Sequence, residues 1–108
     1  MTYVVVITEQ AAREMADTAE WWGRERSVEQ AERWYAGIRE AIATLAEQPD
    51  RCPVAAERVE FRYELRELHF GVGAHPTHRA VFTIVKETVV ILTVRHGARD
   101  RLRPGDIG

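Results

Sequence analysis

The pattern of apolar and polar residues predicts a strand followed by a helix at the start of the chain. Tyr3 to Ile7 is a run rich in β-branched residues, which predicts a strand that is buried on both faces. After Thr8 the apolar residues return every three or four positions, so Glu9 to about Arg24 is predicted to form an amphipathic helix. The residues expected on its apolar side are Ala12, Met15, Ala16, Ala19 and Trp22.

A second helix is predicted to begin near Val28. Ser27 and Gln30 have the spacing of a capping box, in which each side chain accepts a hydrogen bond from the backbone N–H of the other residue. The helix cannot continue through Pro49. Only a short turn separates the two helices, so we expect an antiparallel hairpin. Glycine lowers the stability of a helix, so a glycine within one suggests a packing role. Gly37 within the second helix therefore predicts a close helix crossing. The apolar stripe of this helix is Val28, Ala31, Trp34, Tyr35, Ile38, Ala41, Ile42 and Leu45.

Three more strands are predicted after a loop over residues 49–60. They are Phe61 to Phe70, His78 to Val85 and Thr88 to Val94, and the last two are separated only by Lys86 and Glu87, as in a tight hairpin. The element order β-α-α-β-β-β predicts an α+β fold, in which a two-helix antiparallel hairpin packs on one face of a mainly antiparallel four-stranded sheet. The other face of the sheet is expected to be free for function.

Length and composition place the chain in a narrow class. Its 108 residues are 45% hydrophobic, which predicts one domain over residues 1–108 with a single core. One cysteine, Cys52, excludes an internal disulfide, and no cysteine and histidine clusters predict a zinc site, so we expect no cofactor and no metal. No apolar run has the length of a membrane span, and no signal peptide is recognisable, so a cytoplasmic protein without membrane contact is expected.

Charge is distributed unevenly along the chain. Residues 1–57 hold six arginines and eleven acidic residues, a net charge of −5, whereas residues 58–108 hold nine basic and six acidic residues, a net charge of +3. All four histidines are in the second part. The second part is therefore the better candidate for binding an anionic partner. The alternative, equally supported by composition, is that these charges pair with one another on a solvated surface.

Arginines and a histidine gather at one predicted end of the sheet. The last strand runs into Arg95 and His96, and in an antiparallel hairpin Arg79 at the start of the preceding strand should lie beside them. By strict alternation Val90, Leu92 and Val94 share a face with His96, and Arg95 lies on the other. The strand before contributes Arg62 and Arg66.

Such a group suits RNA cleavage by attack of the 2′-hydroxyl. A guanidinium binds two phosphate oxygens at once, and a histidine can transfer protons near neutral pH, so no metal is needed. The alternative is structural: arginines at strand ends commonly pair with carboxylates such as Glu64 or Glu67, and a lone histidine is more often structural than catalytic.

An ordered set of segments gives the chain a family resemblance. The segments are Thr8 to Ala12, Ala19 to Trp22, Ala31 to Trp34, Glu47 to Pro53, Tyr63 to Leu68, His78 to Ile84 and Val94 to Asp100. Together they resemble the RelE/ParE toxin superfamily, also called plasmid stabilisation proteins, over essentially the whole chain. This resemblance implies a bacterial toxin of a type II toxin–antitoxin system, bound and held inactive by a cognate antitoxin in a hetero-oligomer.

The resemblance leaves two modes of action open. RelE-like members cut messenger RNA on the ribosome, whereas ParE-like members poison DNA gyrase without being nucleases; a module that keeps only antitoxin binding is a further alternative. Glu64 stands where the best-known member has a lysine, Lys86 is the only lysine, and no tyrosine follows Tyr63. The missing tyrosine shifts weight towards ParE, and the three departures together support the module that only binds the antitoxin. For the nuclease alternative the catalytic candidates are Arg66, Arg79, Arg95 and His96, with Glu57 or Glu67 as an additional base and Arg62, Arg99 and Arg101 as substrate-binding residues.

Overall fold

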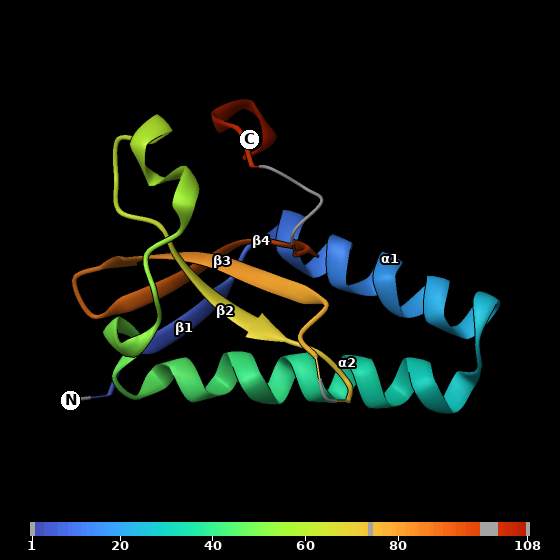
Figure 1. The fold of residues 1–108 in the computed structure, drawn as a ribbon. Helices are drawn as coiled ribbons and strands as arrows, with labels where there is room; N and C mark the ends of the chain where they lie inside the picture. Colours follow the sequence, from blue (N-terminus) through green and yellow to red (C-terminus); the bar gives the residue numbers. More distant parts are fainter. Residues whose placement is uncertain (1, 74, 98–101, 108) are drawn as a thin grey trace.

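The elements follow one another in the predicted order β-α-α-β-β-β (Figure 1). The computed structural model describes residues 2–73, 75–97 and 102–107. Short 3-10 turns lie between the main elements, at Thr44–Ala46, Pro49–Arg51, Ala56–Glu60 and Pro104–Asp106. The helices and strands are β1 (Val4–Ile7), α1 (Glu9–Glu25), α2 (Val28–Ala43), β2 (Arg66–Phe70), β3 (His78–Val85) and β4 (Thr88–His96).

Side-chain caps set the start of both helices. The Thr8 hydroxyl accepts a hydrogen bond from the Ala11 backbone N–H, and the Ser27 hydroxyl accepts one from the Gln30 N–H. Ser27 therefore caps α2 as the sequence predicts, and the short turn between the helices forms the expected hairpin. The predicted apolar stripe of α1 is correct at Met15, Ala19 and Trp22, which belong to or pack against the core. It is wrong at Ala12 and Ala16, which are exposed, and Ala11 is buried in their place.

The sheet has the strand order β1-β4-β3-β2. β1 runs parallel to β4, while β3 pairs antiparallel with both β4 and β2. Val85 lies opposite Thr88, so the turn between β3 and β4 consists of Lys86 and Glu87 as predicted, with Lys86 at a φ of 56°. The α+β architecture with a mainly antiparallel four-stranded sheet is confirmed.

The first strand is not buried on both faces, and that prediction is wrong. β1 is an edge strand, and Val4 and Val6 are 62% and 44% exposed. Val5 and Ile7 pack against the core on the other face. A run of β-branched residues has the same pattern at an edge as in the centre of a sheet, so the sequence could not separate the two cases.

The predicted strand from Phe61 to Phe70 is only half correct. β2 begins at Arg66, and the residues before it form the Ala56–Glu60 turn and a bend. Phe61 and Leu65 nevertheless pack into the hydrophobic interior. Their spacing in the sequence therefore reflects burial by a segment folded over the sheet, and not a strand.

Two hydrophobic clusters lie on opposite faces of the sheet. The helix-side core joins residues of α1 and α2, such as Met15 and Trp34, to Phe82 and Ile91 of the sheet. The second cluster contains Ala55, Leu65, Val81, Leu92 and Leu102. In Figure 1 the Ala56–Glu60 turn (green) and the C-terminal turn (red) lie on the side of the sheet away from α2. The expectation that this face is free is therefore wrong, because it carries a small core of its own.

A β-bulge in the β3–β4 pair changes which side chains share a face. Val81 lies opposite Thr93, whereas Phe82 lies opposite Ile91, so Leu92 is the additional residue. Val94 consequently belongs to the helix-side core together with Ile91, and not with Leu92 as strict alternation predicts. His96 follows Val94 on the helix side of the sheet, and Arg95 points to the other side.

Gly37 allows α2 to approach the sheet and not, as predicted, another helix. A Cβ atom at this position would lie 2.5 Å from Cζ of Phe70 in β2. The ring of Phe70 therefore occupies the space above the glycine. Neither of the described helices combines the length and the apolar character needed to cross a membrane.

Candidate functional site

Arg79 is the centre of a buried ion-pair cluster. Its side chain is 7% exposed, and its Nη1 donates to Glu57 Oε1 at 3.0 Å and to Glu67 Oε2 at 2.8 Å, while Nη2 donates to Glu57 Oε2. The backbone N–H of Leu102 also donates to Glu57 Oε2, at 2.9 Å. The cluster therefore links four segments, which are β3, β2, the Ala56–Glu60 turn and the C-terminal segment.

These contacts favour the charged forms of both partners. The hydrogen bonds from Arg79 lower the pKa of Glu57 to about 2, although burial alone would raise it, and the Leu102 N–H adds to the lowering. The hydrogen bond to Glu57 raises the pKa of Arg79 above its usual range, with burial acting in the opposite direction and Glu67 adding to the increase. The guanidinium of Arg79 thus stays charged, with two carboxylates already bound to it.

Arg95 lies near Arg79 as predicted, and the bulge places it directly opposite Arg79 in the β3–β4 register. Its Nη1 lies 3.6 Å from Asp106 Oδ2 and its Nη2 lies 4.0 Å from Glu14 Oε2. Glu14 in turn accepts hydrogen bonds from the Thr93 hydroxyl and the Val94 N–H, at 2.7 and 3.0 Å. The helix α1 is thereby attached to the end of β4 beyond the point where β1 stops.

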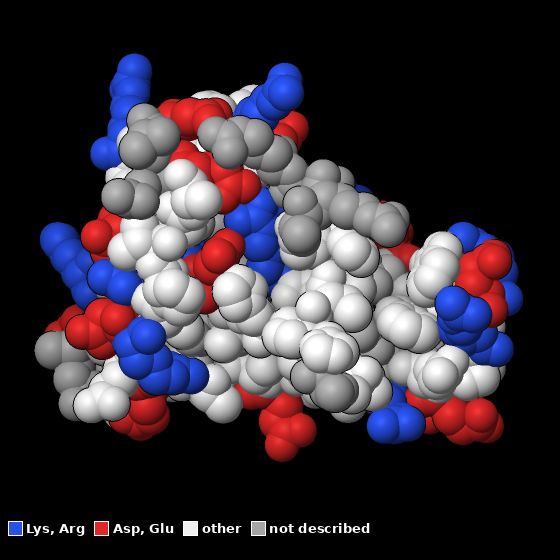
Figure 2. Space-filling view, viewed as in Figure 1, with Lys and Arg blue, Asp and Glu red and all other residues white. Residues whose placement is uncertain are grey.

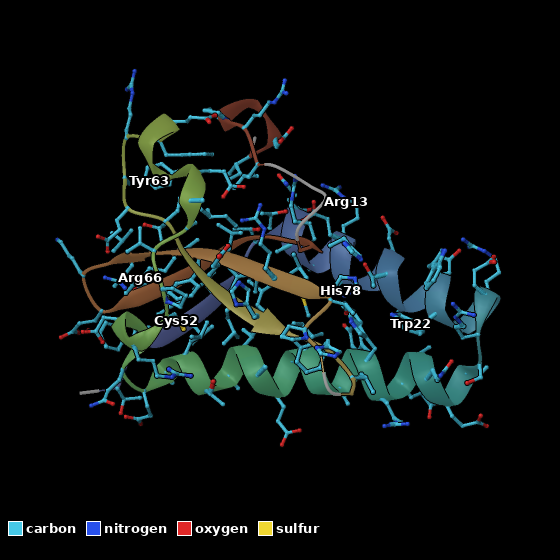
Figure 3. The ribbon with its side chains drawn as sticks, in the orientation of Figure 1. Arg13, Trp22, Cys52, Tyr63, Arg66 and His78 are labelled. Carbon is cyan, nitrogen blue, oxygen red and sulfur yellow. The ribbon has the colours of Figure 1, made fainter. Side chains whose placement is uncertain are left out.

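Arg66 does not join this cluster. It lies opposite Phe82, whereas Arg79 lies opposite His69, and Figure 3 shows Arg66 and His78 towards different ends of the sheet. Arg66 Nη1 donates to the backbone carbonyls of Cys52 and Asp50, at 2.6 and 3.1 Å, and its Nη2 lies 3.0 Å from Glu64 Oε1. This arginine fixes the loop around Cys52 to the start of β2.

The remaining predicted binding residues lie elsewhere. Arg62 is exposed in the bend before β2, and Arg99 and Arg101 lie outside the described residues. In Figure 2 the basic and acidic side chains alternate over the visible face and do not gather into one basic patch. The three arginines predicted as catalytic, Arg66, Arg79 and Arg95, all pair with carboxylates, as the structural alternative expected.

His96 has an aromatic neighbour that the sequence analysis missed. His78 lies opposite it in the register, with ring centroids 5.4 Å apart, and the ring of Trp34 lies 5.1 Å from His78. Burial, and then the nearby His96, lower the pKa of His78 to about 4, so this ring is neutral at physiological pH. Counting back from the Lys86–Glu87 turn places His78 opposite Arg95, and only the bulge moves it to His96.

The chemistry of the site can be stated from these contacts. Cys52 is buried, and burial raises the pKa of its thiol, which makes it a poor nucleophile. Within residues 2–73, 75–97 and 102–107, no three histidine, cysteine, aspartate or glutamate side chains are grouped as metal ligands. The two predicted additional bases, Glu57 and Glu67, are both bound to Arg79.

Comparisons with known proteins agree with the resemblance seen in the sequence. The solved structure of a chromosomal ParDE toxin–antitoxin system from P. aeruginosa is similar, with 16% identity, a TM-score of 0.72 and coverage of 88% of this chain and 96% of that one. The toxin–antitoxin complex RelBE2 from Mycobacterium tuberculosis matches with 23% identity, a TM-score of 0.57 and coverage of 89% and 99%. No curated protein sequence gives a significant match.

The family is established by the sequence itself. The family model described as the ParE toxin of the type II toxin–antitoxin system parDE matches residues 5–101, which is most of the chain. The chain thus belongs to the ParE toxin family, the toxin side of type II toxin–antitoxin systems.

Proposed function

We propose that this protein inhibits growth by binding DNA gyrase and not by cutting messenger RNA, and that a cognate antitoxin protein neutralises it. The observation that supports this proposal is the buried Arg79, whose guanidinium is bound to Glu57 and Glu67. A ParE-type mode of action needs no catalytic centre, whereas a RelE-type mode needs cations that are free to bind RNA.

The pairing of Arg79 with two carboxylates is poorly suited to RNA cleavage. Stabilising a pentacoordinate phosphorane requires donors that already point at the place where negative charge develops. Arg79 would have to leave two carboxylates, and those carboxylates would then lie beside the incoming phosphate and repel it. Arg95 faces the same competition from Glu14 and Asp106.

The arginines predicted as catalytic residues are instead proposed to stabilise the fold. Arg79 joins the C-terminal segment to the sheet through Glu57, Arg95 joins it to α1, and Arg66 fixes the loop before β2. Arg62 remains exposed and is proposed to contact a protein partner. In this proposal His96 belongs to a binding surface and transfers no proton.

The antitoxin partner is supported by two kinds of similarity. The matching family is defined as the toxin of a toxin–antitoxin pair, and both similar solved structures are titled as toxin–antitoxin systems or complexes. A small open reading frame directly beside the gene for this chain is the expected source of the antitoxin.

A supercoiling assay tests the proposed target directly. Purified toxin is added to DNA gyrase, ATP and relaxed plasmid, with a fluoroquinolone as the positive control for trapped cleavage complexes. We expect loss of supercoiling and accumulation of linear plasmid after protease treatment, and both should disappear when the antitoxin is added first.

Induced expression in cells separates the alternatives. Growth arrest with a DNA-damage response and intact messages supports the proposal. Primer extension that reveals discrete cuts within codons, together with unaffected gyrase, would overturn it in favour of the nuclease. Folded protein that causes no arrest would instead indicate a module that only binds the antitoxin.

A further inference from the structure

A cavity of about 440 Å³ lies between the second half of α1 and the end of the sheet where β3 begins and β4 finishes. Figure 3 shows Trp22 on α1 and His78 at the start of β3, on the two sides of this space. We call this cavity the indole pocket. The lining residues used below are Asp17, Trp21, Trp22, Thr77, His78 and His96.

Aromatic rings form most of the wall of the indole pocket. Trp21 and Trp22 are nearly perpendicular, with centroids 5.4 Å apart, and Trp21 is 43% exposed. The Nε1–H of Trp22 is buried and has no hydrogen-bond partner among the described residues. The Nε1–H of Trp34, which does not line the pocket, also has no partner in the described part of the chain, so the exposed Trp21 indole in the wall of the cavity is the feature that indicates a surface completed by a ligand.

The charge of the pocket selects the kind of ligand. The carboxylate of Asp17 makes no hydrogen bond or ion pair with another described residue, whereas Glu14, one turn earlier, is bound to Thr93 and Val94. The whole of α1 holds five acidic residues and two arginines. An anionic ligand is therefore disfavoured, and a cation finds both a free counter-ion and aromatic faces.

We propose that the indole pocket binds the guanidinium of an arginine side chain presented by the antitoxin. The planar cation would lie against an indole ring and pair with Asp17, an arrangement that favours arginine over lysine because arginine is planar and more weakly hydrated. The identity of this occupant rests on the proposed function, whereas the chemistry of the pocket does not.

A small probe tests the chemistry without any partner. N-acetyl-arginine amide is titrated into the full-length protein while the indole N–H signals of the three tryptophans are followed by NMR. We expect saturable shifts of Trp21 and Trp22 with a dissociation constant on the order of a few millimolar, and binding of the neutral isostere N-acetyl-citrulline amide weaker by about tenfold. Trp34 is fully buried and does not line the pocket, so its signal should shift least of the three.

Two variants locate the binding. Asp17→Asn should weaken binding of the arginine probe by about tenfold while leaving that of the citrulline probe unchanged. Glu20→Gln is the matched control, because Glu20 lies on the same helix but pairs with Arg24 and does not line the pocket, and it should change neither value. Equal binding of both probes, or equal effects of the two variants, would overturn the proposal.

The antitoxin complex tests the occupant. Asp17→Asn should weaken the affinity of the full-length toxin for its antitoxin by about tenfold or more, and a single arginine-to-citrulline exchange in a synthetic antitoxin segment should have no additional effect in that variant. If the probe binds but the antitoxin affinity does not change, the antitoxin is not the occupant. That result would leave the gyrase proposal intact, because the gyrase proposal is tested separately by the supercoiling assay.

Discussion

His78 and Arg79 are neighbours in the chain but lie on opposite faces of the same sheet end, in opposite electrostatic situations. On one face Arg79 is buried with Glu57 and Glu67 bound to it. On the other face His78 is neutral and contacts the ring of His96 edge to face. His78 also borders the indole pocket, in which Asp17 has no partner among the described residues. The cross-strand partners repeat the division, since Arg95 lies with Arg79 and His96 with His78.

The difference between the two faces is whether a charged group already has a partner inside the protein. A charge whose hydrogen bonds are already made inside the protein stabilises the structure and is poorly placed to act on a ligand. A charge with aromatic neighbours and no internal partner costs the fold little and is available for recognition. The arginine-rich face therefore accounts for stability, and the indole pocket on the other face is the better candidate for binding.

Removal of Arg79 should have the largest effect on the molecule. Arg79→Met leaves Glu57 and Glu67 buried close together without a counter-charge, so we expect a loss of about 3–5 kcal/mol in the free energy of unfolding. Urea denaturation followed by circular dichroism measures this loss. A variant that kept wild-type stability would show that the cluster is not structural, and would return Arg79 to the list of functional candidates.

The sequence predicts the features of the two faces that depend on neighbouring residues, and it does not predict those that depend on contacts between distant segments. The helices, the two-residue turn and the proximity of Arg79 to the end of β4 follow from local periodicity and from the antiparallel hairpin, and they agree with the predictions, whereas the exact pairing of Arg79 with Arg95 depends on the bulge. The edge position of β1 and the β-bulge at Leu92 depend on which segments meet in space. Neither feature changes the local pattern of apolar and polar residues.

The indole pocket was missed for a related reason. Strict alternation placed Val94 on the face of Leu92, and the bulge transfers it to the other face. The same shift brings His96 opposite His78. Similarly, Glu57 comes from a segment predicted as a loop without regular structure, so the sequence suggests it only as an additional base and not as the partner of Arg79.

Acid should weaken the Arg79 cluster at a lower pH than it affects the other face. The pKa of Glu57 is lowered to about 2, so its contribution is present above about pH 4.5 and is lost as the pH falls towards 2. Glu57→Gln is expected to reduce the free energy of unfolding by about 2–3 kcal/mol at pH 7, with the difference closing near pH 2. Urea denaturation of both proteins from pH 2 to 7 measures it, and a difference independent of pH would contradict the assignment.

The histidine face should respond in a higher pH range. The pKa of His78 is lowered to about 4, mainly by burial, so the unfolded chain binds a proton between about pH 6.5 and 4 that the folded chain does not. Stability is therefore expected to fall as the pH is lowered through this range. His78→Gln should flatten that part of the curve, whereas His75→Gln, on an exposed histidine of the loop before β3, should leave it as in the wild type. Parallel curves for all three proteins would contradict the pKa of His78.

The smallest effect on stability is expected at Asp17, and it is the sharpest test of the comparison. Because this carboxylate has no described partner in the fold, Asp17→Asn should change the free energy of unfolding by no more than about 0.5 kcal/mol, in contrast to Arg79→Met. Differential scanning calorimetry of the two variants beside the wild type gives both values in one experiment. A large loss at Asp17 would mean that both faces use their charges to hold the fold, and the distinction between a structural face and a binding face would fail.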